Sequence, residues 1–392
     1  MPAPPASNPS QHLAHLNEQT WFQIGRLSET LNDIDRAVVA FENVLRYNPQ
    51  NSTALIRCAV ACKSREHYTK AVDYFSKYLK DFDQQNGEHW GSLAHCHLML
   101  DELQKAYNSY QRALYFLPNP KDPQLWYGIG ILYDRYGSYE YAEEAFTSVI
   151  SMDPKFEKAS EIYFRLGIIY KQQQKYSQSL ECFRYVLSSP PKPLVETDIW
   201  FQIGLVYEQQ KEFLPARDAY ERVLKENPNH AKVLQQMGWL YHQPGTSFCN
   251  QDAAIQFINR SLEFSDNQDA AQSHYLLGRC FMAQQRYSNA YHAFQQAINL
   301  DNQNPAIWCS IGALYYQRNQ YRDALDAYSR AICLNPYLSE VWYDIGTLYE
   351  ACHDQVNDAI DAYSRALELD PNNQNIKQRL QALRSGARWE LL

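Results

Sequence analysis

The chain has 392 residues, 36 basic and 44 acidic side chains, and a formal charge of −8. Direct binding to nucleic acid or to an anionic membrane needs a concentrated basic face, so this charge balance disfavours both. No apolar run approaches the roughly 18 residues that suggest a membrane span, and residues 1–10 lack the apolar core of a signal peptide.

Nine cysteines are scattered singly along the chain, and their spacing matches no metal-binding motif. Cys58 and Cys62 lie four residues apart, which places them on one helical face, and we expect both to be buried core residues. His95 and His97 are two apart and would point in different directions from a helix, so a metal site there is disfavoured. Without an export signal, reduced cysteines suggest the cytosol or the nucleus.

Residues 1–17 begin with a Pro- and Ala-rich stretch and predict a disordered N-terminal segment. After it, five segments begin with Trp and end with Pro 28 positions later, at residues 21–49, 90–118, 126–154, 200–228 and 308–336. Between the two ends, Gly, Tyr and Ala recur at fixed offsets. In the fourth segment of this kind, Trp200, Gly204, Tyr207 and Ala216 occupy these places.

This pattern is typical of the tetratricopeptide repeat, a helix–turn–helix hairpin of about 34 residues. Ten copies can be placed, at residues 18–51, 52–85, 87–120, 123–156, 160–193, 197–230, 231–268, 271–304, 305–338 and 339–373. The predicted fold is therefore all-α, a right-handed α-α superhelix of the tetratricopeptide-repeat solenoid type. Extra residues around 243–249 predict a longer loop in the seventh repeat. Residues 374–392 predict a capping helix and a tail.

Positions are counted here from the first residue of each repeat. Glycine is frequent at position 8 of the first helix, and we expect it to let the two helices of the hairpin approach closely. Proline at the end of a repeat cannot continue the second helix and predicts its end.

The outward-turned positions of the first helix, 5, 9, 12 and 13, are the candidate partner-binding groove, because repeat solenoids bind partners along the surface lined by these helices. Many of these side chains are aromatic or aliphatic, which favours an amphipathic helix as the occupant and disfavours a chaperone adaptor, which grips a carboxylate with Lys and Asn. The candidate residues are Phe22, Arg26, Ile56, Val60, His95, Leu98, Met99, Tyr127, Ile131, Phe164, Phe201, Trp239, Tyr275, Arg279, Tyr316 and Tyr343. Residues at positions 5 and 9 also touch the neighbouring repeat. For any single one of them, a role in packing is therefore as well supported as a role in binding a partner.

No nucleophile elbow, phosphate loop or zinc-protease motif is present in the sequence, so we expect a non-enzymatic protein with no catalytic residue, metal or cofactor.

Several runs go beyond the generic repeat, namely Leu-Trp-Tyr-Gly-Ile-Gly-Ile-Leu-Tyr-Asp-Arg-Tyr-Gly at 125–137, Trp-Cys-Ser-Ile-Gly at 308–312 and Val-Trp-Tyr-Asp-Ile-Gly-Thr-Leu-Tyr-Glu at 341–350. Arg165, Lys171 and Asp344 also fall outside the repeat consensus. Residues 18–385 thereby resemble the repeat region of the fungal general transcriptional co-repressor family, also called the glucose-repression mediator.

That resemblance implies a nuclear scaffold. Its first three repeats would receive the N-terminal helical segment of a WD-repeat co-repressor. Sequence-specific DNA-binding transcription factors and histone deacetylases would be further partners, and direct contact with DNA would be left to them.

Two alternatives remain open. The same repeat type, with a similar Trp-Cys-Ser-Ile-Gly run, precedes the catalytic domain of JmjC histone demethylases, although no strand-rich segment is evident here. A repeat scaffold outside transcription, for example in protein import or cell-cycle ubiquitination, is equally compatible with composition and periodicity.

Overall fold

The computed structural model describes residues 9–118, 121–352 and 355–384, and every regular element in these ranges is an α-helix. The contacts divide the chain into an N-terminal unit, residues 1–193, and a C-terminal unit, residues 194–392. None of the described helices is long and apolar enough to cross a membrane. The predicted all-α tetratricopeptide-repeat fold is confirmed.

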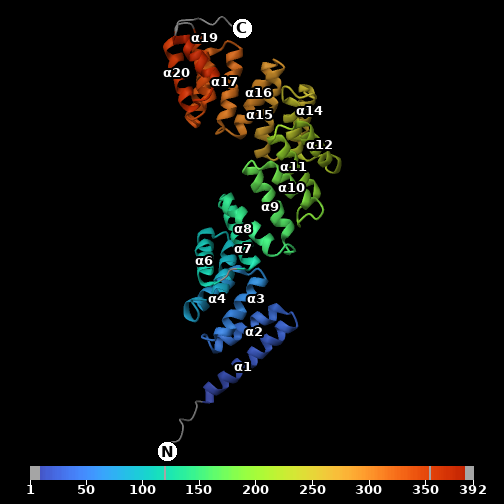
Figure 1. Ribbon diagram of the computed structural model, residues 1–392, viewed down its shortest axis with the longest axis vertical. Helices are drawn as coiled ribbons and strands as arrows, with labels where there is room; N and C mark the ends of the chain where they lie inside the picture. Colours follow the sequence, from blue (N-terminus) through green and yellow to red (C-terminus); the bar gives the residue numbers. More distant parts are fainter. Residues whose placement is uncertain (1–8, 119–120, 353–354, 385–392) are drawn as a thin grey trace, which may run out of the picture. The chain divides into compact units, whose positions relative to one another are not determined.

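Each of the ten predicted repeats holds two consecutive helices (Figure 1). In the N-terminal unit the helices are α1 (Pro9–Thr30), α2 (Ile34–Tyr47), α3 (Ser52–Ser64), α4 (Tyr68–Asp81), α5 (Gly87–Met99), α6 (Leu103–Phe116), α7 (Pro123–Arg135), α8 (Tyr139–Met152), α9 (Ala159–Gln172) and α10 (Tyr176–Leu187). In the C-terminal unit they are α11 (Glu196–Gln209), α12 (Phe213–Glu226), α13 (Ala231–His242), α14 (Gln251–Phe264), α15 (Asn267–Ala283), α16 (Tyr287–Leu300), α17 (Pro305–Gln317), α18 (Tyr321–Leu334), α19 (Ser339–Ala351), α20 (Val356–Leu369) and α21 (Gln374–Arg384).

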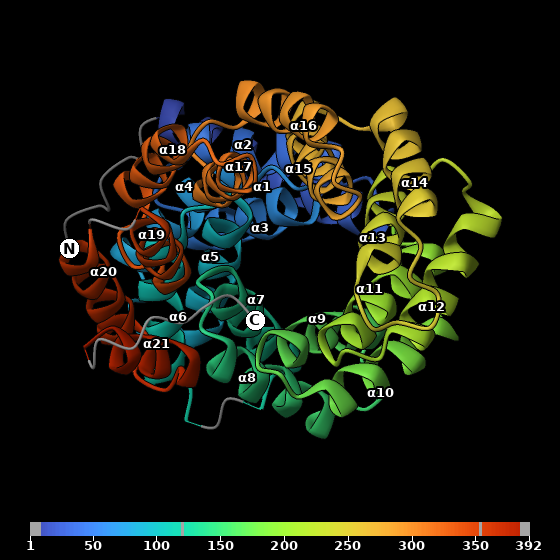
Figure 2. The same ribbon diagram turned by 90° about the horizontal axis from the view of Figure 1, so that it is seen from above.

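In each unit the odd-numbered first helices lie on one side and the even-numbered second helices on the other (Figure 2). The longer loop predicted in the seventh repeat is present between His242, where α13 ends, and Gln251, where α14 begins. At the C-terminal end, Ile376 and Leu380 of α21 pack on the core of the tenth repeat, as expected of a capping helix.

The N-terminal boundary differs from the prediction. Helix α1 begins at Pro9, so residues 9–17 are helical and not part of a disordered segment. Leu13 and Leu16 in this extension are both exposed, and the Pro-rich start concealed the helical pattern around them. Residues 1–8 and 385–392, which belong to the predicted segment and tail, lie outside the described residues.

A glycine packed under an aromatic ring joins the two helices of most repeats. A Cβ atom on Gly25 would lie 2.5 Å from the ring of Phe41, and one on Gly312 would lie 2.6 Å from the ring of Tyr328. The same contact occurs at Gly130, Gly167, Gly204, Gly278 and Gly346. Real Cβ atoms do not approach carbon this closely, so the predicted need for glycine at position 8 is confirmed.

The turn between the two helices depends on a left-handed residue at position 15. In the second repeat Glu66 has φ 61°, and its N–H donates to the carbonyl of Lys63 while the N–H of His67 donates to that of Cys62. This pair of hydrogen bonds is a Schellman ending, which satisfies the last carbonyls of the helix. Position 15 has a positive φ also at Asn32, Asp101, Gly137, Gln174, Lys211, Gln285 and Asn319.

Cys58 and Cys62 are both fully buried in the core, which confirms the prediction. Burial raises the pKa of both thiols, so they remain uncharged and unreactive packing groups.

A partly buried carboxyl group lies beside the core of the sixth repeat. The Tyr220 hydroxyl donates to Glu208 at 2.8 Å. In the tenth repeat Tyr363 donates to Glu350 in the same way, but there Arg379 also donates to the carboxylate, at 3.1 Å. Glu208 has no such cation among the described residues, and burial raises its pKa to about 7.

Replacing Gly312 with Leu should destabilise the ninth repeat, because the new side chain must displace the ring of Tyr328. We expect a loss of about 1–3 kcal/mol, measured as a lower urea midpoint by circular dichroism. Gln317→Leu, on an exposed position of the same helix, should change stability by less than about 0.5 kcal/mol. Equal midpoints for G312L and the parent would show that the ring-on-glycine contact does not constrain the hairpin.

Replacing Glu208 with Gln should stabilise the protein more at pH 8 than at pH 5. The folded-state pKa lies above the ordinary value of a glutamate, so the folded chain holds a proton that the unfolded chain releases, and stability falls as the pH rises to about 7. Gln keeps the hydrogen bond from Tyr220 but does not titrate, so it removes this loss of stability. We expect the free energy of unfolding at pH 8 to rise by about 1–3 kcal/mol.

Urea unfolding at both pH values measures this gain. The exposed Glu226→Gln, near the end of the next helix, is the matched control and should show the same small change at pH 5 and pH 8. A pH-independent effect of E208Q would contradict a protonated Glu208.

Candidate partner-binding surface

The structure divides the predicted groove residues into three groups by exposure. Ten are partly buried, namely Phe22, Ile56, His95, Phe164, Phe201, Trp239, Tyr275, Arg279, Tyr316 and Tyr343. Three are exposed, namely Arg26, Val60 and Met99. Three are buried, namely Leu98, Tyr127 and Ile131.

The three buried residues correct the prediction, since none of them can line an open groove. Leu98 is fully buried in the core cluster that joins the third and fourth repeats. Tyr127 packs its ring 5.7 Å from that of Phe156, in the link to the fifth repeat. Ile131 belongs to the same cluster. They were predicted as outward-facing because their positions lie off the stripe that packs within the hairpin, but neighbouring repeats cover them.

Most aromatic residues at position 5 serve their own hairpin. The ring centroids of Phe22 and Phe41 are 5.8 Å apart, in an edge-to-face arrangement. Tyr343 lies 5.5 Å from Tyr363 in the tenth repeat. Each position-5 ring therefore covers the ring that rests on the glycine. Such contacts stabilise the pair beyond the area they bury, so these residues have a structural role within the hairpin.

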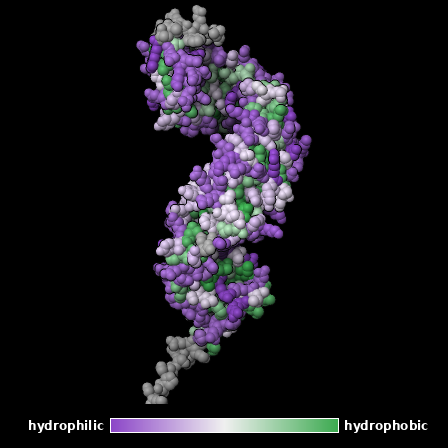
Figure 3. All heavy atoms as spheres, viewed as in Figure 1, coloured by the Kyte–Doolittle hydropathy of each residue, from purple (hydrophilic) through white to green (hydrophobic). Residues whose placement is uncertain are grey.

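Large exposed hydrophobic side chains on first helices occur in one region of the described chain. They are confined to α1, α3 and α5, the first helices of the first three repeats. Val60 of α3 is 52% exposed and Met99 of α5 is 45% exposed. Those on α1 are Leu13, Leu16, Ile24 and Leu27. Figure 3 shows patches of hydrophobic residues among hydrophilic ones on the face of this unit that it presents.

The exposed face of α1 corresponds to a stacking face that later repeats bury. Positions 7 and 10 of the first helix are buried in repeats two to ten. At Ile311 and Leu314, for example, the preceding repeat packs on them. In the first repeat the same positions are Ile24, 41% exposed, and Leu27, 61% exposed. No described helix lies on this face of α1. The sequence prediction missed both residues, although the repeat register alone identifies them.

Ion pairs hold the first helices of the fourth and fifth repeats together. Arg165 of α9 lies 2.8 Å from Asp134 of α7 and 3.1 Å from Glu161 of its own helix. Another residue outside the repeat consensus, Asp344, accepts a hydrogen bond from the Cys309 thiol at 3.6 Å. Burial raises the pKa of Asp344 to about 6. Both of these residues therefore connect neighbouring repeats.

Nothing in the described part of the chain resembles a metal centre, since no group of three or more His, Cys, Asp or Glu side chains is placed to hold an ion. The arrangement instead offers partly exposed apolar side chains on a rigid helical frame, which suits the binding of another polypeptide.

Comparison with known proteins gives the same repeat type along the chain. Family models described as tetratricopeptide repeat match residues 22–86, 123–156, 160–193, 197–230 and 305–338, and one described as TPR repeat matches residues 278–317. The crystal structure of PilW, a type IV pilus biogenesis factor, aligns with a TM-score of 0.50 at 16% identity, over 57% of this chain and 99% of PilW. At that identity the likeness concerns the fold alone.

Two relatives are much more similar in sequence. The general transcriptional corepressor ssn6 of Schizosaccharomyces pombe is 63% identical over 302 residues, which are 77% of this chain and 27% of that protein. The general transcriptional corepressor trfA of Dictyostelium discoideum is 63% identical over 290 residues, 74% of this chain and 21% of that protein. The chain thus matches only about a quarter of the length of these relatives. It is similar in sequence to part of these general transcriptional corepressors, and it belongs to the tetratricopeptide-repeat family.

Proposed function

We propose that the chain is a non-enzymatic protein-interaction scaffold of a general transcriptional corepressor complex, acting in the nucleus. The similarity to corepressors in two distant organisms supports this role over a JmjC demethylase or a scaffold outside transcription. The observation that carries the proposal is the confinement of exposed apolar side chains on first helices to α1, α3 and α5. Exposed apolar surface at a defined place on a soluble frame marks an interaction site.

The partner of this surface is a helical segment, for a geometric reason. In the later repeats of each unit, the face formed by positions 7 and 10 is covered by the preceding hairpin. The open face of α1 therefore has the shape and the apolar character that accept a helix. An amphipathic helix presents side chains at the matching spacing. We assign this role to the N-terminal helical segment of a WD-repeat co-repressor.

The remaining candidate residues would serve other partners. Phe201, Trp239, Tyr275, Arg279, Tyr316 and Tyr343 of the C-terminal unit are partly exposed on first helices. We propose that DNA-binding transcription factors and histone deacetylases use this surface. The charge of −8 is consistent with contact to DNA through such partners.

Replacing both Val60 and Met99 with Glu should weaken binding of the helical segment at least tenfold. Each change places a charge where an apolar contact would form, and burying one such side chain contributes about 1.5–3 kcal/mol. Calorimetric titration of the full chain with the segment measures the loss. Leu27→Glu should weaken binding separately, through the open face of α1.

The matched control carries Val39→Glu and Tyr141→Glu, which change two exposed hydrophobic side chains on second helices of the same unit. This variant should bind like the parent, and all variants should keep the parent's helical circular dichroism. Equal weakening by the control and the test variants would contradict a specific site on α1, α3 and α5.

A further inference from the structure

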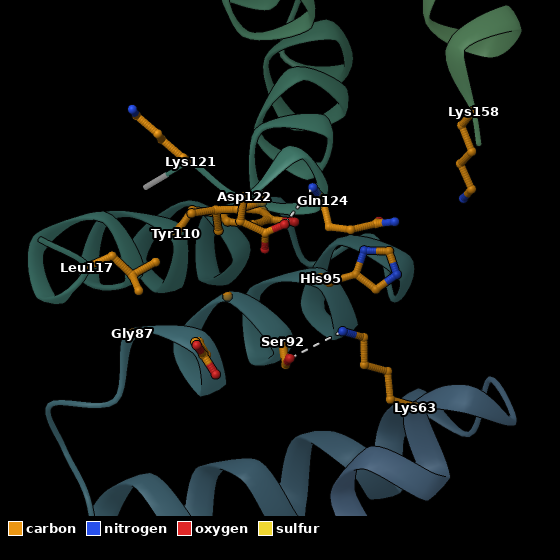
Figure 4. Close-up of a pocket in the computed structure, with 13 residues that line it drawn as sticks. Lys63, Gly87, Ser92, His95, Tyr110, Leu117, Lys121, Asp122, Gln124 and Lys158 are labelled. Atoms are coloured by element: carbon orange, nitrogen blue, oxygen red, sulfur yellow. Dashed lines mark hydrogen bonds between the residues drawn. The ribbon is translucent and has the colours of Figure 1, made fainter. Parts of the chain in front are cut away.

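A pocket of about 560 Å³ lies in the N-terminal unit, beside the exposed apolar side chains of α3 and α5. Its walls come from α5, α6 and the start of α7, with one side chain from α3 and one from the residue before α9 (Figure 4). We call it the basic pocket and define it by Lys63, Ser92, His95, Tyr110, Gln124 and Lys158.

Two lysines without an ion-pair partner line this pocket on different sides. Lys63 and Lys158 approach His95 from opposite sides (Figure 4). The Lys63 ammonium donates to the Ser92 hydroxyl at 3.2 Å, and the Lys158 ammonium lies over the Tyr127 ring, 5.0 Å from its centre. Neither lysine forms an ion pair within the described ranges. Burial lowers the pKa of Lys63, which reflects the cost of holding its charge there.

Burial and the lysines both lower the pKa of the His95 imidazole. Burial first, and then the charges of Lys63 and Lys158, lower its pKa to about 4. The ring is therefore neutral near pH 7 and can take part in a hydrogen bond without adding charge. An anion placed between the two lysines would be attracted by both.

The Tyr110 hydroxyl is a hydrogen-bond donor at the basic pocket. Its side chain is only 3% exposed, and its hydroxyl has no hydrogen-bond partner among the described residues. A Cβ on Gly128 would lie 2.1 Å from this oxygen, so the glycine leaves just enough room for it. Burial raises the pKa of Tyr110, which keeps the hydroxyl protonated. The protonated hydroxyl can therefore donate a hydrogen bond to an acceptor bound in the pocket.

The surrounding charges favour an acceptor of one negative charge. Asp122 and Glu88 also line the pocket, and the Asp122 carboxylate is engaged in capping α7 through the N–H of Gln124 at 3.0 Å. Lys121 lines the pocket as well, but its side chain points away from Lys63 and Lys158 (Figure 4). The lining thus has one more lysine than carboxylates and no arginine among its described residues. Arginine is the residue best suited to a doubly charged phosphate.

We propose that the basic pocket binds the side-chain carboxylate of a glutamate in the helical partner segment. Val60 lies three residues before Lys63 on α3, and Met99 lies four residues after His95 on α5, so each is one helical turn from the pocket. A segment that covers Val60 and Met99 would bring a polar residue of its own to the lysines. The identity of the occupant rests on the proposed function, whereas the carboxylate preference rests on the pocket alone.

The test uses small blocked probes on the full chain. Histidine is labelled with ¹³C at Cε1, and the His95 resonance is followed during titration with N-acetyl-glutamate N-methylamide. The neutral glutamine analogue and the phosphoserine analogue are titrated in parallel. The glutamate probe should give a saturable shift of the His95 signal, and the glutamine probe should give none.

Variants identify the groups that bind the probe. Lys63→Met with Lys158→Met should weaken glutamate binding at least fivefold, and Tyr110→Phe should weaken it at least twofold. Lys80→Met with Lys155→Met removes two exposed lysines of the same unit and should leave binding unchanged. Melting curves check that each variant is folded.

Three results would overturn the proposal, namely the absence of a saturable shift, equal responses to the glutamate and glutamine probes, or phosphoserine binding at least threefold tighter than glutamate. The probe assay needs no partner segment. A segment that fails to bind would therefore refute the proposed function and leave a positive probe result standing.

Discussion

The contact between a glycine and an aromatic ring sets the geometry on which the rest of the structure depends. Seven repeats place the ring of position 24, or its equivalent, where a Cβ of position 8 would otherwise be. Because the two helices can then lie close together, the other positions of the first helix acquire fixed surroundings. Within each unit, positions 7 and 10 face the preceding repeat and an aromatic residue at position 5 covers the ring. Val60 at position 9 and Met99 at position 13 reach solvent. The exposure of these side chains is thus a consequence of hairpin packing.

The same geometry places apolar and basic side chains next to each other on the surface of the N-terminal unit. Around α3 and α5, exposed Val60 and Met99 adjoin the Tyr110 hydroxyl and two lysines that form no ion pair in the described part of the chain. Elsewhere in the same unit, cations such as Arg165 are matched by carboxylates. The unmatched lysines are therefore a local property of the surface, in a chain whose total charge is negative.

The fold could be predicted because its determinants are local and repeated. Glycine at position 8, the small and aromatic core positions and the final proline recur in register, and each has one physical reason. The left-handed residue at position 15 escaped prediction, since only Gly137 among the eight is a glycine and the Schellman hydrogen bonds stabilise the turn for other residues. Burial of Tyr127 and Ile131 depends on stacking between repeats, which a periodicity within one hairpin cannot show. The basic pocket joins Lys63 to Lys158, far apart in sequence, and only the fold brings them together.

Hydrogen–deuterium exchange of the full chain, with and without the helical segment of a WD-repeat co-repressor, tests the central claim most directly. The bound segment should slow amide exchange in α1, α3 and α5, where the exposed apolar side chains lie. Exchange in α11 to α19 should stay unchanged. Protection confined to the C-terminal unit, or spread evenly over both units, would contradict a partner site built on the first three repeats.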